Sequence, residues 1–180
     1  PWTLPYYPAL FEQYGFRDYF QQYTYVTPIR AAVVTPGVEE RARRVYQNPA
    51  YQFRHVEKSN WKKYADDLRT IYNLAWARHS GVKPMSEEKA RELVKSALPI
   101  LDEQLTWFAY AGDDPVAFFV VLPEINQIVK YLDGQFNLWA KLKFLLLKAK
   151  GVMTKTFGVS FGVVPDHQGK GVEAAIALRF

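Results

Sequence analysis

The sequence contains no cysteine and only three histidines, which are His55, His79 and His167. The lack of cysteine excludes disulfides, thiolate metal ligands and a cysteine nucleophile, and the scattered histidines do not match a metal-ligand spacing. The uninterrupted apolar runs, such as those at residues 116–122 and 144–147, are much shorter than the ~20 residues of a membrane-spanning helix. No signal-peptide pattern opens the chain. We therefore expect a cytoplasmic protein without a metal site.

Aromatic residues and positive charge are, by contrast, abundant. The 180 residues include 12 Tyr, 12 Phe and 5 Trp, and 49% of the residues are hydrophobic. This composition is typical of a folded domain, in which large aromatic side chains fill the core. The net charge of +5 favours an anionic partner, which is a phosphorylated cofactor, a nucleic acid or an acidic membrane surface. Charge alone does not choose among these three.

Prolines divide the front of the chain from the remainder. The Thr35-Pro36-Gly37 and Asn48-Pro49 breaks set off residues 1–35 from the rest, with 36–50 as a linker. Within residues 1–35, Pro8 is suited to open a short helix that Gly15 closes, and Tyr23 to Thr27 is a run of β-forming residues. We expect a helix, a turn and a strand there.

From Tyr51 onward the elements alternate between strands and helices. Ser59 or Asn60 is suited to cap a helix that reaches about Arg78, and Ser86 to cap a second one with acidic residues in its first turn. The other expected elements are a strand at 51–56, a β-hairpin at 105–121, a helix-rich stretch at 123–150, a strand at 155–164 and a helix at 169–180.

One motif carries chemistry, and it lies between the last expected strand and the last expected helix. The sequence Val163-Val-Pro-Asp-His-Gln-Gly-Lys-Gly-Val places a glycine-rich turn before the first turn of a helix. Glycines allow close approach of the backbone, and the free N–H groups of a helix start bind anions. The motif matches neither the P-loop pattern nor the dinucleotide-binding pattern.

This motif resembles the acyl-CoA loop of the GNAT superfamily of acyltransferases, a glutamine or arginine followed by a glycine-rich turn. Gln168, Gly169, Lys170 and Gly171 match it, and Glu173 departs from it by replacing a small residue. By this resemblance, residues 168–172 (Gln168 to Val172) hold the CoA pyrophosphate, and the backbone of Val163 and Val164 pairs with the pantetheine arm.

The order of elements between residues 51 and 180 is also similar to that family. The resemblance implies an α/β (α+β) fold with a mixed central sheet flanked by helices, incomplete at the C-terminus, and makes 123–150 a helical insertion. Within the family the chain looks closest to uncharacterised bacterial proteins that share Asn73-x-x-Trp76 and Pro84-Met85. The cofactor implied is acetyl-CoA or another acyl-CoA, and the acceptor is a small-molecule or peptide amine.

The catalytic residues are not identified by the resemblance. The family's proton acceptor is often a glutamate on the strand before the loop, and residues 153–164 contain no carboxylate. Residues 1–35 resemble the last helix, Gly-Phe turn and final strand of such a fold, which suggests a tandem protein. In that helix Phe11 stands where the family commonly has a tyrosine proton donor, and Tyr14 lies on another face. We therefore expect this chain alone to be inactive.

Two other functions compete with the acyltransferase. One is a catalytically degenerate lobe that binds CoA or a protein, and the other is a basic protein that binds nucleic acid or membrane. The lysine-rich segment 138–150 is suited to an anionic membrane, but such a helix more often packs its apolar side on the core. The basic cluster of Arg41, Arg43 and Arg44 is more typical of a solvated surface than of a nucleic-acid site. The paired carboxylates at 66–67, 87–88 and 113–114 are likewise typical of a solvated surface. His167 has no evident partner to orient it as a base. We expect no nucleic-acid and no membrane partner.

Overall fold

The computed structural model describes residues 4–28 and 34–179. The chain divides into two compact units, Pro1–Val33 and Val34–Phe180.

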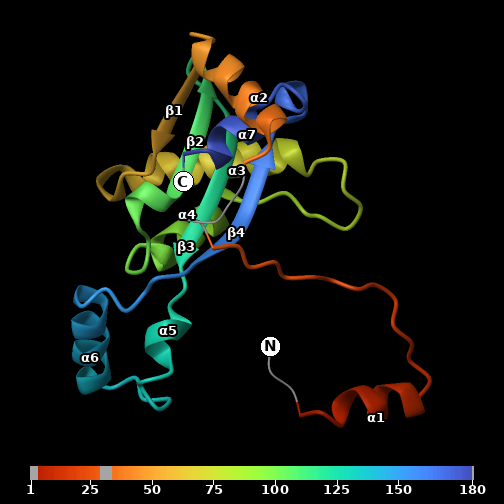
Figure 1. The fold of residues 1–180 in the computed structure, drawn as a ribbon, viewed down its shortest axis with the longest axis vertical. Helices are drawn as coiled ribbons and strands as arrows, with labels where there is room; N and C mark the ends of the chain where they lie inside the picture. The colour runs from red at the N-terminus through yellow and green to blue at the C-terminus, as the bar shows by residue number, and fades with distance from the viewer. Residues whose placement is uncertain (1–3, 29–33, 180) are drawn as a thin grey trace. The chain divides into compact units, whose positions relative to one another are not determined.

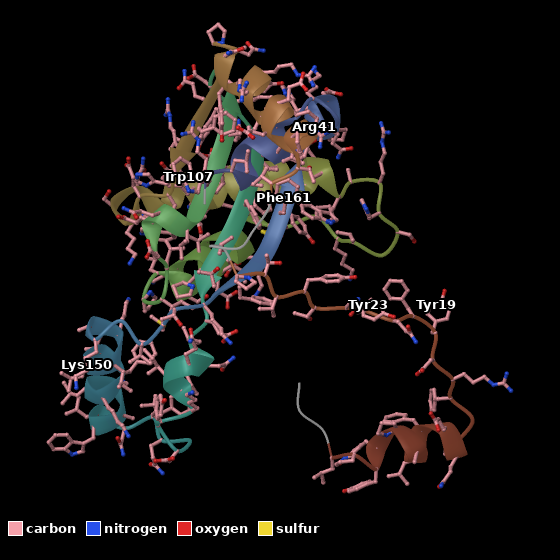
Figure 2. The ribbon with its side chains drawn as sticks, viewed as in Figure 1. Tyr19, Tyr23, Arg41, Trp107, Lys150 and Phe161 are labelled. Atoms are coloured by element: carbon pink, nitrogen blue, oxygen red, sulfur yellow. The ribbon has the colours of Figure 1, made fainter. Side chains whose placement is uncertain are left out.

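The first unit contains one helix, α1 (Tyr7–Gln13), with a proline in its first turn. Gly15 follows it at φ +102°, so the predicted helix and its glycine stop are confirmed. The strand predicted at Tyr23 to Thr27 does not form: these residues are extended without a pairing strand, and Tyr19 and Tyr23 are exposed (Figure 2). A strand needs a neighbour for its backbone groups, which β-propensity alone does not supply. Residues 1–3 and 29–33 of the predicted front segment lie outside the described residues.

The second unit is built on a four-stranded antiparallel sheet (Figure 1). Its strands are β1 (Tyr51–His55), β2 (Thr106–Ala111), β3 (Asp114–Pro123) and β4 (Thr156–Val163), and they lie in the order β1-β2-β3-β4. The predicted hairpin between β2 and β3 is confirmed, with Gly112 in its turn at φ +62°. β4 pairs with β3 on one side and has no paired strand on its other side within the described residues.

Six helices accompany this sheet in the described part of the second unit. They are α2 (Pro36–Gln47), α3 (Trp61–Ala75), α4 (Glu87–Ala97), α5 (Asn126–Val129), α6 (Leu138–Ala149) and α7 (Val172–Ala177). The hydroxyl of Ser86 accepts a hydrogen bond from the backbone N–H of Lys89, which confirms the predicted cap of α4. α7 is shorter than the helix predicted for 169–180, because Gly169 and Gly171 both have positive φ.

Helix α2 occupies most of the segment that was expected to be a linker. Pro36 lies in its first turn, where the missing N–H has no intrahelical partner to lose, and the residue before it, Thr35, is extended. Ala42 and Val45 are buried in the core and α2 packs against α7. The Thr-Pro-Gly sequence therefore begins a packed helix.

Helices cover both faces of the sheet. On one face α3 contributes Tyr64 and Trp76, whose rings lie 5.2 Å from Phe108 and 6.2 Å from Phe118. On the other face α2 and α7 pack together, and the Arg179 guanidinium lies over aromatic rings, at 4.5 Å from Tyr46, 5.3 Å from Phe53 and 5.5 Å from Trp107. The predicted class, an α/β fold with a central sheet flanked by helices, is confirmed. The prediction of a mixed sheet is wrong, because every pairing among the described strands is antiparallel.

Candidate functional site

The predicted loop lies between β4 and α7. A short 3-10 turn at Pro165–His167 follows β4, and residues 168–171 then lead into α7, with Gly171 as its N-cap. Gly169 has φ +70° and Gly171 has φ +90°. The sequence requires glycine here because side chains rarely adopt this backbone conformation.

The two glycines have different surroundings. A Cβ on Gly169 would have no atom within 4 Å, whereas a Cβ on Gly171 would lie 3.2 Å from the Arg41 carbonyl oxygen and 3.3 Å from Val45. Gly171 is therefore needed for α2 to pack on the loop. Gly169 is open, so its surface is the part of the loop that a ligand can approach.

The backbone of this loop offers several unused donors. Within the described residues, none of the N–H groups of residues 169–173 donates a hydrogen bond of good geometry to the protein. The Lys170 ammonium is near enough to lower the pKa of His167. Successive free N–H groups beside a positive charge are suited to an anion. Gly171 and Val172 are buried, so the exposed Gly169 and Lys170 are the residues of the loop that an anion can reach, and the dipole of the six-residue helix α7 adds little.

The end of β4 is fixed by hydrogen bonds on both sides. Val164 N–H donates to Val116 O at 2.9 Å, so the neighbouring pair, Val163 and Ala117, exchanges no hydrogen bonds across the ladder. The N–H and C=O of Val163 therefore point toward the free edge of β4, where the C=O accepts from Gln168 Nε2 at 2.9 Å. Two valines were expected to pair with pantetheine. The N–H of Val163 points toward this free edge, whereas the N–H of Val164 is bonded to β3.

A groove of about 370 Å³ adjoins the loop and the free edge of β4. It is lined by the end of α3, by β4 and by the loop: Ala75, Trp76, His79, Phe161, Gly162, Val163, Gln168, Gly169 and Glu173. A Cβ on Gly162 would lie 2.7 and 2.9 Å from two atoms of the Trp76 ring. The indole therefore sits directly on the backbone of β4 and forms one wall of the groove.

Two titratable side chains line this groove, Glu173 from α7 and His79 from the loop after α3. One carboxylate oxygen of Glu173 is buried without a hydrogen-bond partner among the described residues. Glu173 was noted in the sequence as a departure from the acyl-CoA pattern, and its carboxylate lines the same groove as Gln168 and Gly169. A carboxylate and an imidazole are both able to take a proton from an amine.

Sequence reasoning missed the α3 side of the groove. Trp76 and His79 are far from the loop in sequence, and the one signal was the Asn73-x-x-Trp76 and Pro84-Met85 signature. The Asn73 side chain donates to Met85 O at 3.0 Å and accepts from Met85 N–H at 2.7 Å. Asn73 therefore holds the connection between α3 and α4 from which His79 reaches the groove.

His167 has the orienting partner that the sequence did not reveal. Its Nδ1 lies 2.8 Å from the hydroxyl of Tyr51 on β1. Burial lowers the pKa of His167, Lys170 lowers it further, and Asp166 opposes this. His167 does not line the groove, so its role is to fix the 3-10 turn below the loop.

Three of the paired carboxylates, Asp66, Asp67 and Glu87, have structural partners. Asp66 accepts from Arg91 at 3.2 Å, which joins α3 to α4, and Arg91 also pairs with Glu87 at 2.6 Å. Asp67 accepts from Tyr110 at 2.6 Å; burial and this hydrogen bond both raise the pKa of that phenol. In residues 4–28 and 34–179, no group of His, Asp or Glu side chains suited to a metal ion is found.

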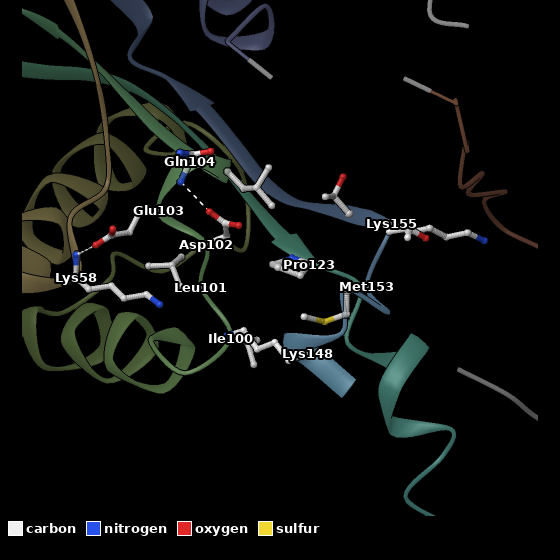
Figure 3. Close-up of a pocket in the computed structure, with 14 residues that line it drawn as sticks. Lys58, Ile100, Leu101, Asp102, Glu103, Gln104, Pro123, Lys148, Met153 and Lys155 are labelled. Atoms are coloured by element: carbon white, nitrogen blue, oxygen red, sulfur yellow. Dashed lines mark hydrogen bonds between the residues drawn. The ribbon is translucent and has the colours of Figure 1, made fainter. Parts of the chain in front are cut away.

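A larger cavity, of about 650 Å³, lies at the other end of β4 (Figure 3). Its lining includes Pro123, Lys148 and Met153, which border the predicted insertion. Its carboxylates are already engaged: Glu103 accepts from the Lys58 N–H at 2.6 Å and Asp102 from the Gln104 N–H at 3.0 Å. The glycine loop at 168–171 and the smaller groove lie where β4 ends, and the larger cavity lies where β4 begins. The two cavities therefore occupy opposite ends of β4.

Comparison with known proteins gives two curated relatives, while no protein-family model matches the sequence. The chain is 33% identical over 102 residues to the bacterial ceramide synthase of Caulobacter vibrioides, covering 55% of this chain and 26% of that protein. It is 25% identical over 181 residues to protein YghO of Escherichia coli, covering 99% of this chain and 45% of that protein. The chain thus spans between a quarter and a half of the length of these relatives.

Two solved structures are similar to the chain. One is an agmatine N-acetyltransferase, with a TM-score of 0.39 and 17% identity, matched over 72% of this chain and 70% of that one. The other is the polyamine N-acetyltransferase of Drosophila melanogaster, with a TM-score of 0.36 and 18% identity, matched over 72% and 69%. Both of these proteins are N-acetyltransferases.

Proposed function

We propose that this chain is a lobe of an acyl-CoA-dependent N-acyltransferase and that its groove binds the cofactor. The observation that carries the proposal is the junction of the groove with the loop: Gly169, whose N–H group donates to no protein group in the described residues, lines a cavity bounded by the open edge of β4. An anion-binding loop beside an unpaired strand edge suits a ligand with a pyrophosphate and an extended amide-containing arm.

Each part of this site has a role in the proposal. Gly169 and Lys170 contribute a backbone donor and a positive charge to the pyrophosphate, and the Val163 N–H on the free edge pairs with an amide of the pantetheine arm. The Trp76 ring supports the arm from the α3 side. The bound acyl-CoA supplies a thioester as the activated acyl group.

The chemistry asked of the protein is modest. The amine nitrogen forms a bond to the thioester carbonyl carbon, the carbon–sulfur bond breaks, and the amine proton must be accepted while the thiolate gains one. Positioning of the two reactants supplies a large part of the rate. His79, from the loop after α3, lines the groove and is the group proposed to accept the amine proton, a role that residues 153–164 do not offer; Glu173 lies beside the pyrophosphate loop, a pantetheine length away from the thioester.

We further propose a long-chain amine as the acceptor class. A ceramide is a long-chain amino alcohol acylated on its nitrogen, so the name of the Caulobacter relative describes acyl transfer to such an amine. The likeness to that relative covers 55% of this chain at 33% identity. In the full-length protein, acyl-CoA consumption should then be faster with a long-chain amine than with a short one of equal charge.

A binding-only lobe is the second candidate. It is favoured by the carboxylate-free strand β4 and by the presence of Glu173 beside the loop, where its charge opposes a pyrophosphate. The two candidates share CoA binding and differ in turnover. Acceptor-dependent release of free thiol in the full-length protein separates them.

Calorimetry with CoA and desulfo-CoA tests the cofactor site. We expect both ligands to bind and to compete, and we expect Gly169→Ala to weaken binding at least about tenfold, because the added side chain lies where the anion would approach; its positive φ costs about 1–2 kcal/mol of stability, which leaves the fold intact. Gly171→Ala is the comparison variant: it should also lose binding, but with a lower unfolding midpoint, because its side chain meets α2. Parent-like CoA binding by Gly169→Ala would exclude this loop as the site.

A further inference from the structure

Helix α6 has an exposed apolar face that the fold does not use. Figure 1 shows α6 beside α5, at the end of the sheet where β3 ends and β4 begins. The sequence favoured packing of its apolar side on the core, but the large side chains on one side of α6 and at its start are exposed. Their exposed fractions are 80% for Phe136, 71% for Leu138, 78% for Trp139, 45% for Leu142, 60% for Leu145 and 62% for Leu146.

The helical wheel of α6 separates an inner from an outer face. At about 100° per residue, the exposed residues of the helix (Leu138, Trp139, Leu142, Leu145, Leu146 and Ala149) fall within one arc of about 120°. The less exposed residues Ala140, Phe144 and Leu147 fall on the opposite side. The helix therefore already has an inner apolar face toward its own unit, and the outer face is a second one.

Lysines border the outer face on both sides. Lys143 and Lys150 fall along one border of the apolar arc, and Lys141 and Lys148 along the other. Lys143 donates to Tyr131 O at 2.6 Å and Lys148 to Pro99 O at 3.2 Å, which ties the helix to its neighbours. The side-chain ammonium groups of Lys141 and of Lys150, the latter labelled in Figure 2, have no hydrogen-bond or ion-pair partner among the described residues.

No negative charge balances these lysines locally. Residues 134–165 contain five lysines and not one aspartate or glutamate. A second copy of the chain pairing face to face through α6 would bring lysine borders against lysine borders, which opposes a symmetric dimer on this surface. A nucleic acid would satisfy the lysines but not the apolar arc. An occupant that is apolar in the middle and anionic at its boundary satisfies both.

We propose that α6 lies flat on an anionic lipid bilayer, with its apolar arc in the acyl-chain boundary and its bordering lysines at the headgroups. The exposed Trp139 is of the residue type that prefers this boundary. Within the residues that the structure describes, none of the helices has the length and apolar character to cross a bilayer, so the contact is peripheral. This inference goes beyond the proposed acyltransferase function and does not depend on it.

Vesicle co-sedimentation of the chain tests the proposal. We expect binding to phosphatidylcholine vesicles with about 30% phosphatidylglycerol, little binding to phosphatidylcholine alone, and weaker binding at about 0.5 M salt than at about 0.05 M. Leu145→Ser with Leu146→Ser should weaken binding about tenfold or more, as should Lys141→Glu with Lys150→Glu.

Matched variants control for composition and charge. Leu74→Ser with Leu93→Ser removes two exposed leucines from α3 and α4, and Lys83→Glu with Lys95→Glu makes the same change in net charge away from α6. Both should bind vesicles like the parent. Thermal melting by circular dichroism checks that the variants fold, and quenching of Trp139 by brominated lipid, absent in Trp139→Phe, reports the contact in an otherwise unchanged chain.

Three results would overturn the proposal. One is equal vesicle binding by the parent and both α6 variants. The second is the lack of any preference for anionic vesicles. The third is a dimer in light scattering that the Leu145 and Leu146 changes dissociate while vesicles are not bound, since the face would then be covered by a second copy.

Discussion

Replacing Gly162 by alanine tests whether the Trp76 wall of the groove is built as described. The new Cβ would lie 2.7 and 2.9 Å from two atoms of the Trp76 ring and 3.1 Å from Phe118 Cε1. Contacts below 3.0 Å force something to move, and the ring has little freedom because it stacks on Tyr72 at 4.9 Å and on Phe118 at 6.2 Å. We expect the indole to be pushed out of its position and the groove to change shape.

The expected loss of unfolding free energy in Gly162→Ala can be isolated by comparison with Gly158→Ala on the same strand. Alanine at Gly158 would meet only Phe119, at 3.5 Å, which is ordinary contact. Both substitutions remove a strand glycine and so gain roughly 0.5–1 kcal/mol from reduced unfolded-state entropy. Overpacking at Gly162 should cost about 1–3 kcal/mol. The difference between the two variants isolates this cost, because the entropy gain cancels.

Urea unfolding and near-ultraviolet circular dichroism measure this difference. Gly162→Ala should unfold at lower urea than Gly158→Ala with an unchanged m value, and it should melt roughly 3 °C or more below it. Its near-ultraviolet spectrum and its affinity for CoA should also change, while those of Gly158→Ala should not. Equal unfolding midpoints for the two variants would show that the indole does not rest on Gly162, and the wall would have to be redrawn.

Three more predictions concern charges and motion around the groove. Glu173→Gln should raise CoA affinity about threefold or more, since it removes a negative charge beside the pyrophosphate loop; Glu88→Gln on α4 is the control, and equal or weaker binding by Glu173→Gln would place the carboxylate elsewhere. The pKa of His167 is lowered in the fold, so its contribution to stability is present above its unfolded pKa and is lost as pH falls through the folded value. The unfolding free energy should therefore decline less between about pH 7 and pH 5 in His167→Gln than in the parent, and parallel curves would refute this. Finally, residues 123–150 border the larger cavity at the start of β4, and their amide hydrogen exchange should slow when an acceptor analogue occupies that cavity beside bound CoA, while α4 stays unchanged; exchange that ignores the ligands would leave the segment a structural appendage.

Local signals in the sequence predicted most elements of the fold. The Ser86 cap, the glycine after α1 and the Gly112 hairpin are each determined within a few residues, and all three are confirmed. Other outcomes depend on distant contacts. The strand predicted from Tyr23 to Thr27 failed, because the run has the residues of a strand but no partner strand in the described part. Local signals also did not show that residues 36–47 pack as helix α2 against α7.

The candidate site also has one part that local sequence predicts and another that depends on distant contacts. The glycine loop at 168–171 is a contiguous motif, so its backbone conformation was readable from the sequence. The opposite wall, with Trp76 and His79, is about 90 residues earlier and reaches the loop only through the packing of α3 on the sheet. Glu173 was visible as a departure from the pattern, but its place in the groove wall depends on the direction in which α7 leaves the loop.

The hydrogen bond from Gln168 to Val163 sets a limit on what can extend the sheet. Up to Phe161, which is labelled in Figure 2, the edge of β4 that faces away from β3 has no paired strand within the described residues. At Val163 the outward carbonyl is already occupied by the Gln168 amide. An added strand or an extended ligand can therefore pair continuously along β4 only as far as the amide of Gln168. There it must either stop or turn toward the loop, so the register of anything bound at this edge is fixed by one side chain.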